Sequence, residues 1–147
     1  MNLLVANLGS TSFKYRLYRF DGAHERLLAQ GGAGRVSDYG PAIDACLDAL
    51  RAGGHLTVAG DLQGVVFKTV HGGALTGCVT AGADVEAALA EFADLAPAHN
   101  PAYAAGLRQF REKLPGVRLV AVFETAFYQW VPDYAQRYAG PPAWHTA

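Results

Sequence analysis

The first twenty residues, MNLLVANLGSTSFKYRLYRF (1–20), decide the fold of this chain. The apolar run at 3–6 is long enough for one buried strand. A polar turn with a single glycine follows at 7–12, and alternating apolar residues then indicate a second strand at 13–20. Lys14, Arg16 and Tyr18 are expected on the face opposite those apolar residues. The segment therefore predicts a strand, a polar loop and a second strand.

The loop carries groups that suit a phosphate or a hydrated metal ion. Three hydroxyls, one carboxamide and one ammonium lie at or beside it, from Ser10, Thr11, Ser12, Asn7 and Lys14. Together with the free N–H groups of a glycine-containing loop, these are the donors and acceptors that such ligands need. Polar residues also fill turns that bind nothing, so the residues alone leave both interpretations open.

Length and composition limit the class of protein. The chain has 147 residues, of which 51% are hydrophobic, and its net charge is −1. A single domain of this size can bury roughly 70% of its unfolded surface. The near-neutral charge gives no sign of nucleic acid or of an anionic membrane as partner. With no long apolar run and no basic, then apolar, N-terminus, we expect a cytoplasmic protein without a membrane span or signal peptide.

The middle of the chain alternates helical and strand patterns. A third antiparallel strand is expected at 25–33, and we interpret its glycine cluster at 31–34 as an irregular strand end, because it fits neither a Walker A nor a dinucleotide motif. Residues 56–62 give no clear pattern. A helix is expected between Ser37 or Asp38, as its cap, and Gly53-Gly54, where it ends. A second helix is expected at 83–92, and a third is capped by Asn100 and begins with Pro101. Strands are expected at 65–67 and 77–80, and a central strand at 117–123.

The two cysteines show no metal-binding or redox spacing. Cys46 and Cys78 form no C-x-x-C and no ligand set with the five histidines. Cys46 falls on the apolar face of the first expected helix, so it is expected to fill the core. A disulfide is not expected in the cytoplasm.

Three later segments hold further candidate residues. The strand at 65–67 runs into K-T-V-H-G-G (68–73), which on its own fits a glycine turn with a solvated Lys68. In L-A-P-A-H-N-P (95–101), His99 taken alone is better explained as a packed or surface histidine than as a catalytic group. Glu124 directly follows the strand at 117–123, where ligands bind in α/β sheets, although an ordinary acidic loop residue is an equal alternative.

Four of these strings, in the same order, resemble the acetate and propionate kinases. N-L-G-S-T-S-F-K (7–14) matches the phosphate loop N-x-G-S-S/T-S-L/F-K, and V-H-G-G (70–73) matches the end of H-R-V/I-V-H-G-G. L-A-P-A-H-N-P (95–101) matches L-A-P-x-H-N-P, and V-F-E-T-A-F-Y-Q (122–129) resembles V-F-D-T-A-F-H-Q. The resemblance covers nearly the whole chain but only the first third to half of a family member.

The resemblance implies a fold that the pattern alone gives only as α/β or α+β. It implies an α/β, ribonuclease-H-like mixed sheet flanked by helices, which is one lobe of the acetate kinase, hexokinase, Hsp70 and actin superfamily. Residues 1–147 would then form a single N-terminal domain, with the C-terminal lobe absent. Because such a lobe would expose the apolar surface that normally meets its partner, we expect a homo-oligomer or a missing C-terminal lobe as partner.

The implied reaction is phosphoryl transfer between ATP and a short-chain carboxylate such as acetate or propionate, giving an acyl phosphate. The resemblance carries over residue roles as follows: Lys68, Glu124 and His99 are catalytic; Asn7, Ser10, Ser12 and Lys14 bind the nucleotide phosphates; Lys68, Val70 and Ala98 bind the carboxylate; and Asn7 and Glu124 hold Mg²⁺ through its waters.

Three of these residues depart from the family pattern, and so do Tyr128 and Phe67, the latter standing where the family has histidine. Lys68 stands where the family has arginine and Glu124 where it has aspartate, so both charges are kept with a different geometry. Tyr128 replaces the usual histidine, and Ala98 replaces a leucine that lines the acyl pocket. Two functions therefore remain: the substrate lobe of a carboxylate kinase, or a kinase-derived domain that no longer catalyses and serves as a binding or dimerisation module.

Overall fold

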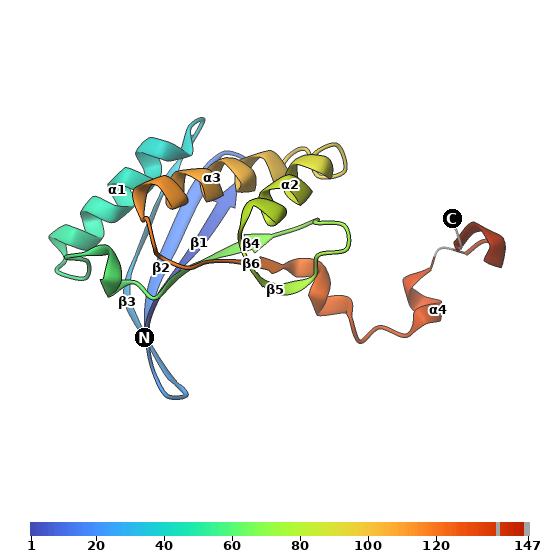
Figure 1. Cartoon of the computed structure of the whole chain (residues 1–147), viewed down its shortest axis with the longest axis horizontal. Coiled ribbons are helices and arrows are strands. Elements are labelled where there is room, and N and C mark those ends of the chain that lie inside the picture. Colours follow the sequence, from blue (N-terminus) through green and yellow to red (C-terminus); the bar gives the residue numbers. More distant parts are fainter. Residues whose placement is uncertain (138, 146–147) are drawn as a thin grey trace.

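A computed structural model of the chain describes residues 1–137 and 139–145 and shows one mixed sheet of six strands, in the order β3-β2-β1-β4-β6-β5 (Figure 1). The strands are β1 (Asn2–Gly9), β2 (Ser12–Asp21), β3 (His24–Gly34), β4 (Gly64–Thr69), β5 (Gly77–Thr80) and β6 (Leu119–Phe123). The helices are α1 (Tyr39–Ala52), α2 (Ala83–Glu91), α3 (Asn100–Lys113) and α4 (Asp133–Gln136), with 3₁₀ turns η1 (Ala59–Asp61), η2 (Glu124–Tyr128) and η3 (Pro142–His145).

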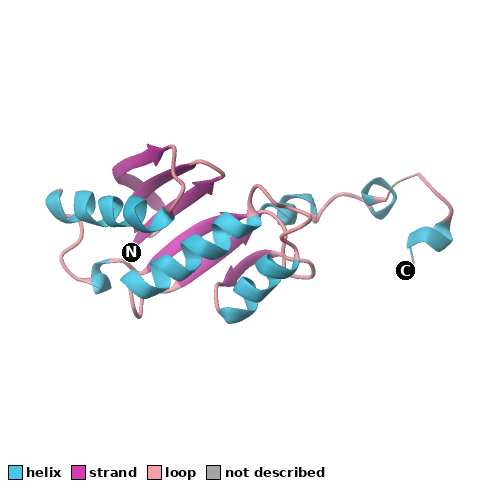
Figure 2. Cartoon of the chain, turned by 90° about the horizontal axis from the view of Figure 1, so that it is seen from above, coloured by secondary structure: helices cyan, strands magenta, loops and turns pink. Residues whose placement is uncertain are grey.

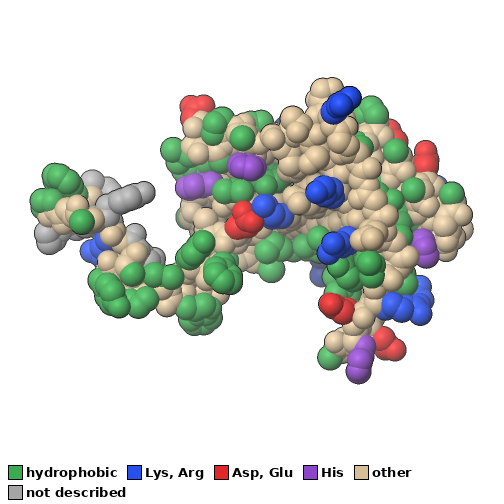
Figure 3. All heavy atoms as spheres, turned by 180° about the vertical axis from the view of Figure 1, so that it is seen from behind, with side chains coloured by type: hydrophobic (Ala, Val, Ile, Leu, Met, Phe, Trp, Pro, Cys, Tyr) green, Lys and Arg blue, Asp and Glu red, His purple; other side chains and the backbone are tan. Residues whose placement is uncertain are grey.

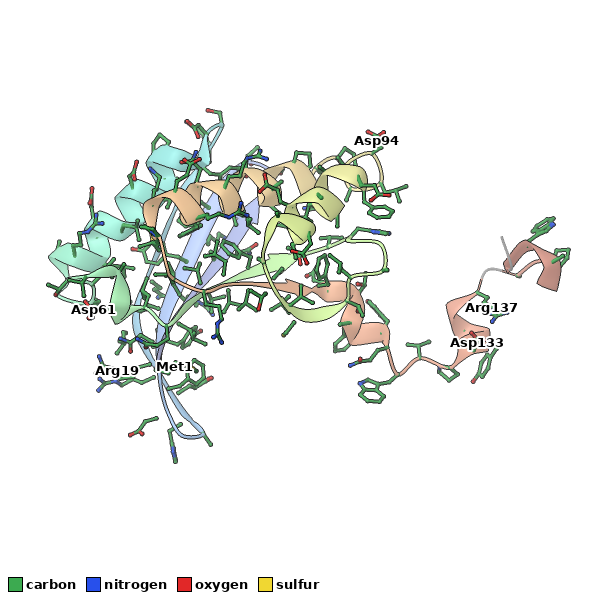
Figure 4. The ribbon with its side chains drawn as sticks, in the orientation of Figure 1. Met1, Arg19, Asp61, Asp94, Asp133 and Arg137 are labelled. Atoms are coloured by element: carbon green, nitrogen blue, oxygen red, sulfur yellow. The ribbon has the colours of Figure 1, made fainter. Side chains whose placement is uncertain are left out.

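The pairing of the strands brings three strand ends to one edge. β1, β4 and β6 run parallel, whereas β2, β3 and β5 pair antiparallel with their neighbours. The carboxyl ends of β1, β4 and β6 therefore share one edge, as parallel strands require. Figure 4 shows Met1 and Arg19 at the opposite end of the sheet, where the N-terminal ammonium donates to the carbonyl of Phe20.

All three long helices lie on the same face of the sheet (Figures 1 and 2). The residues of β1 alternate accordingly: Leu4, Ala6 and Leu8 are fully buried beneath the helices, whereas Val5 and Asn7 between them are exposed. The predicted period-two pattern is thus confirmed over β1 and over residues 13–17 of β2, with Lys14 and Arg16 on the face away from the helices. We call this second face the open face. Beyond the irregularity at Leu17 and Tyr18 the pattern is not kept, because Phe20, expected inward, is only half-buried.

Helix α1 begins and ends where the sequence indicates. The Asp38 side chain accepts a hydrogen bond from the backbone N–H of Gly40 at 2.9 Å, and Gly53 closes the other end. The expected apolar residues face the core, including Cys46, which is buried and free. Cys78 is also free and is exposed on β5.

Helix α3 packs directly on the central strand. A methyl group at Gly106 would overlap the buried side chain of Leu8, so glycine permits this close approach. Tyr103, Leu107 and Phe110 face inward, as predicted. The predicted cap is wrong, because the residue before the helix is His99 and Asn100 is already helical. The Asn100 side chain is buried and donates to backbone carbonyls outside the helix.

Beyond β6 the chain leaves the sheet. Turn η2 and helix α4 lead away from the body toward the C-terminus (Figure 1). Figure 4 shows Asp133 and Arg137 on this segment, where they form an ion pair of 2.6 Å. None of the described helices is long and apolar enough to cross a membrane.

Candidate functional site

The register of the sheet aligns the candidate residues of three strands. Asn7 pairs with Lys14 across β1 and β2, and Lys68 pairs with Val122 across β4 and β6. Ala6 on β1 pairs with Phe67 on β4, and Asn7 and Lys68 are the next residues of these two strands. Lys14, Asn7, Lys68 and Val122 therefore form one row on the open face, close to the edge where the parallel strands end.

Lys68 is paired with the carboxylate that follows the next strand. Its Nζ lies 2.9 Å from Glu124 Oε1, with 43% of the lysine and 49% of the glutamate side chain exposed. The hydrogen bond to Glu124 is the main reason why the pKa of Lys68 is raised. Figure 3 shows the open face with basic side chains gathered at its centre and an acidic side chain against them. Lys68 and Glu124, the two charged residues that depart from the family pattern, therefore contact each other.

The candidate phosphate-binding residues line three separate hollows. Asn7 and Lys14 line the largest, about 640 Å³, on the open face together with Arg16 and Gln30. Ser10 lies in a second hollow of about 410 Å³ on the helix side of the sheet edge. Ser12 shares a third, of about 380 Å³, with Lys14 and the glycines of β3. Only Asn7 and Lys14 of this set are thus brought together with the row that contains Lys68.

Ser10 shares its hollow with the residue expected to line the acyl pocket. Ala98 and Pro97, from the segment before α3, line the same 410 Å³ as Ser10 and Tyr39. The loop between β1 and β2 and the segment before α3 are therefore neighbours in space, as a joint role would require.

A tyrosine that the sequence analysis did not single out holds the loop. The Tyr39 hydroxyl donates to the backbone carbonyl of Gly9, and the N–H of Val36 donates to the carbonyl of Thr11 at 3.0 Å. Tyr39 is buried at the start of α1, where its position in the sequence indicates only an apolar helix residue. No local signal reveals this contact, because it joins residues 30 positions apart.

The H-G-G and H-N-P segments are tied together by Asn100. Its side-chain amide donates to the carbonyl of His71 at 2.8 Å and to that of Phe92 at 3.2 Å. The His71 ring stacks on Phe92, with centroids 5.0 Å apart, and its Nδ1 accepts from the N–H of Gly73. Asn100 thus fixes the backbone that follows β4.

His99 itself is exposed beside a buried tyrosine. Its ring stacks on Tyr103 with centroids 6.1 Å apart. Burial raises the pKa of the Tyr103 phenol, and the nearby Lys68 ammonium opposes that rise. Tyr103 therefore lies within electrostatic reach of Lys68, a relationship that the helical pattern of α3 did not indicate. Val70, half-buried and two residues after Lys68, packs against the core.

The side chains of Asn7 and Glu124 would suit a hydrated metal ion that is bound to the phosphates of a nucleotide. Among residues 1–137 and 139–145, no three His, Cys, Asp or Glu side chains lie together as a metal site. Asn7 lies on β1 and Glu124 directly follows β6, and β4 with Lys68 runs between these two strands. Mg²⁺ keeps several waters and takes few protein ligands, so contact through water suits this pair.

Known proteins similar to the chain share its fold. The model of the acetokinase family matches residues 30–147. Acetate kinase of Staphylococcus aureus is 33% identical over 162 residues, covering 95% of this chain and 40% of that protein. The crystal structure of Porphyromonas gingivalis acetate kinase superposes with a TM-score of 0.85 at 30% identity, covering 99% of this chain and 42% of its own. A propionate kinase from Francisella tularensis gives 0.82 at 28%, covering 96% and 41%.

These relatives confirm the fold and the resemblance drawn from the four motifs. The mixed sheet with flanking helices is that of the acetate and propionate kinases, and the chain spans about 40% of the length of the relatives it matches. Because the family model covers most of its residues, this chain belongs to the acetokinase family.

Proposed function

We propose that residues 1–147 form the substrate-binding lobe of a carboxylate kinase, which moves a phosphoryl group between ATP and a short-chain acid. The observation that carries this proposal is the row of Lys14, Asn7 and Lys68 at the carboxyl edge of the parallel strands, with Glu124 at 2.9 Å from Lys68. Names of the related proteins point to acetate or propionate as the acid.

In this proposal a carboxylate oxygen of the acid attacks the γ-phosphorus of ATP. The new oxygen–phosphorus bond forms as the bond to the bridging oxygen of ADP breaks, so acyl phosphate and ADP are the products. Such transfer depends on positioning and on neutralising charge at the phosphoryl oxygens. Lys68 neutralises the acid and the moving phosphoryl group, while Asn7 and Lys14 hold the nucleotide phosphates; Ser10 and Ser12, which line other hollows, are left out of this contact.

The remaining roles concern the acid and the metal. Val70, Ala98 and His99 border the acid, and the small Ala98 favours an acyl chain longer than that of acetate. Mg²⁺, when bound, screens the phosphate charges, and Asn7 and Glu124 would hold its waters. Glu124 must then exchange its contact with Lys68 for those waters, which the half-exposed position of both side chains permits. A C-terminal lobe, or a second copy of the chain, would supply the rest of the nucleotide site.

The proposal is tested by trapping acyl phosphate with hydroxylamine. The purified chain receives Mg-ATP with acetate, propionate or butyrate, and Lys68→Ala is compared with Lys113→Ala. Lys113 is the matched control because it is also ion-paired, to Asp44 at 2.6 Å, but on helices away from the edge. We expect hydroxamate from the native chain and from Lys113→Ala, and none from Lys68→Ala. Equal product from both variants would refute the role of Lys68.

A second candidate is a kinase-derived module that binds without catalysis. The mutual ion pair of Lys68 and Glu124 favours it, since each charge is already satisfied by the other. Here no acid yields hydroxamate, and calorimetry detects no binding of Mg-ATP. Binding of Mg-ATP without hydroxamate would instead indicate a lobe that lacks its partner.

A further inference from the structure

The proposed reaction requires a second partner for Lys68. Its ammonium contacts Glu124 at 2.9 Å, and both side chains are half-exposed. Under the proposed function, on which this inference rests, Glu124 turns to the waters of Mg²⁺ and so releases Lys68. A lysine carries its charge on a flexible four-carbon stem, whereas phosphoryl transfer depends on accurate positioning. A fixed acceptor is therefore expected near the edge of the sheet.

Helix α3 lies over the central strands (Figure 2), and its first turns carry a tyrosine near the end of β4. Asn100, Tyr103 and Gly106 follow one another three residues apart, so they share one face of the helix. At one end of this series, the Asn100 amide donates to the carbonyl of His71, just beyond β4. At the other end, Gly106 lies against Leu8 of β1. Tyr103 therefore lies between these two contacts, over the carboxyl ends of β1 and β4.

Tyr103 is also held firmly in place. The residue is only 2% exposed, and its ring stacks on that of His99 with the two planes 17° apart. The hydroxyl of a buried tyrosine usually finds a hydrogen-bond partner, since leaving it unpaired is costly. A phenol oxygen can accept, and an ammonium can only donate, so the two groups are complementary.

The charged groups at the edge act on this phenol. Burial raises the pKa of Tyr103, the Lys68 ammonium opposes that rise, and the Glu124 carboxylate adds to it. Lys68 is the next-to-last residue of β4 and comes from the open face, whereas Tyr103 comes from the helix face, so they approach each other at the strand end. The Tyr39 phenol also acts on Tyr103, and because its own hydroxyl donates to the carbonyl of Gly9, it can only accept from Tyr103.

We propose that Tyr103 is a positioning residue for Lys68, and that its hydroxyl oxygen accepts from the Lys68 ammonium when Glu124 turns to metal-bound water. The lysine then exchanges a carboxylate for a phenol oxygen without leaving the edge of the sheet. Two of its three N–H groups stay free for the acid and for the moving phosphoryl group. Because the phenol is neutral, it leaves the positive charge of Lys68 for those oxygens, whereas a carboxylate would cancel it.

Nuclear magnetic resonance of the Lys68 side chain tests this contact without kinase activity. The chain has three lysines, Lys14, Lys68 and Lys113, so their ε-methylene signals are few and are assigned by substitution. The two ε protons of a held lysine differ in chemical shift, whereas fast rotamer exchange makes those of a free lysine coincide. In Glu124→Ala, where the carboxylate is gone, we expect the two protons of Lys68 to stay distinct. In Glu124→Ala combined with Tyr103→Phe, they should merge.

The matched control removes another buried phenol. Tyr15 is 8% exposed on β2, and Tyr15→Phe in the Glu124→Ala background should leave the Lys68 signals distinct. Merged signals in Glu124→Ala alone would overturn the proposal, and so would distinct signals after Tyr103→Phe. Should the double variant not fold by circular dichroism, nuclear Overhauser effects between the Lys68 ε protons and the Tyr103 ring in Glu124→Ala decide instead. Their absence would equally overturn the contact.

Hydroxamate formation tests the proposed function separately. If the native chain forms none with any acid, the proposed function fails, while the Lys68 signals still decide the contact. If it forms hydroxamate, Tyr103→Phe should lower kcat by about 10–100-fold with the KM for Mg-ATP little changed, because a misplaced ammonium slows the transfer and not the binding. Tyr15→Phe should keep the native kcat. An unchanged kcat in Tyr103→Phe would overturn the positioning role.

Discussion

The side-chain amide of Asn100 donates a hydrogen bond to the backbone carbonyl of His71 at 2.8 Å, across 29 positions of sequence. Asn100 is fully buried and serves the carbonyl of Phe92 as well. One side chain thus joins the strand end that carries Lys68 to the segment that carries His99. The geometry of the candidate site depends on a residue with no proposed contact to substrate.

Asn100→Ala should therefore lower the free energy of unfolding by about 1–3 kcal/mol, because two part-buried carbonyls lose their donor. Urea denaturation followed by circular dichroism measures the change. Asn7→Ala, which truncates an exposed asparagine, is the matched control and should change stability by less than about 0.5 kcal/mol. Equal losses in both variants would show that the Asn100 amide is not a structural tie.

Tyr39→Phe tests the contact that holds the loop between β1 and β2. Removal of the hydroxyl frees the Gly9 carbonyl, which should cost about 1 kcal/mol of stability and speed amide hydrogen exchange at residues 10–12. Hydrogen exchange followed by mass spectrometry reads both effects. Tyr18→Phe is the control, since the Tyr18 hydroxyl accepts one long, weak hydrogen bond from Arg16 Nη1, at 3.5 Å. Unchanged exchange in Tyr39→Phe would mean that the loop holds its shape unaided.

Alkaline pH should destabilise the fold through Cys46. Burial raises the pKa of this thiol from 9.0 to about 12. Because the folded thiol keeps its proton to higher pH than the unfolded one, its stabilising effect is complete below about pH 9 and is lost as pH rises toward 12. The loss is about 1.4 kcal/mol per pH unit over that window.

Urea denaturation at pH 8.5, 9.5 and 10 measures that slope. Cys46→Ala should reduce the alkaline loss, whereas Cys78→Ala, at an exposed position of β5, leaves the buried thiol in place and should keep it. Burial also raises the pKa values of Tyr15, Tyr39 and Tyr103, which adds to the slope above pH 10. A slope that is the same in Cys46→Ala and the native chain would contradict the assignment.

Gly106→Ala tests the close packing of α3 on β1. Alanine favours a helix by about 1 kcal/mol over glycine, yet the new methyl group would overlap Leu8 in the core. We expect a net destabilisation of about 1–3 kcal/mol. In a Leu8→Ala background the methyl group has room, and the same substitution should become stabilising. If Gly106→Ala stabilises the native chain as well, the helix does not depend on glycine here.

The fold was largely predictable because it rests on local patterns. Period-two alternation gave the faces of the first two strands, and Asp38 with Gly53 gave the ends of α1. Asn100 was assigned as a cap because asparagine suits that role in sequence, but the buried carbonyls around it determine its actual position. Propensity describes a residue's neighbours in the chain and not those in space.

The sequence predicts which residues belong to the candidate site but not how they are arranged in space. Motif resemblance named Asn7, Lys14, Lys68 and Glu124, but the 2.9 Å contact of Lys68 with Glu124 follows from the β4–β6 register, which no local pattern encodes. Ser10 and Asn7 line different hollows, because Asn7 lies on the open face of the sheet and Ser10 lies on its helix side. Assembly of the site is a property of the sheet.

The parallel centre of the sheet also has a consequence for synthesis on the ribosome. Val5 pairs with Val66, and Val66 pairs with Val120. The parallel neighbours of β1 are therefore β4 and then β6, which are synthesised much later than β1. The antiparallel strands β1, β2 and β3 can pair as soon as they emerge, whereas the central strands cannot close until β6 has left the exit tunnel. A nascent chain stalled before residue 119 would thus carry β4 without its outer neighbour, and its exposed strand edge would be a natural target for chaperones.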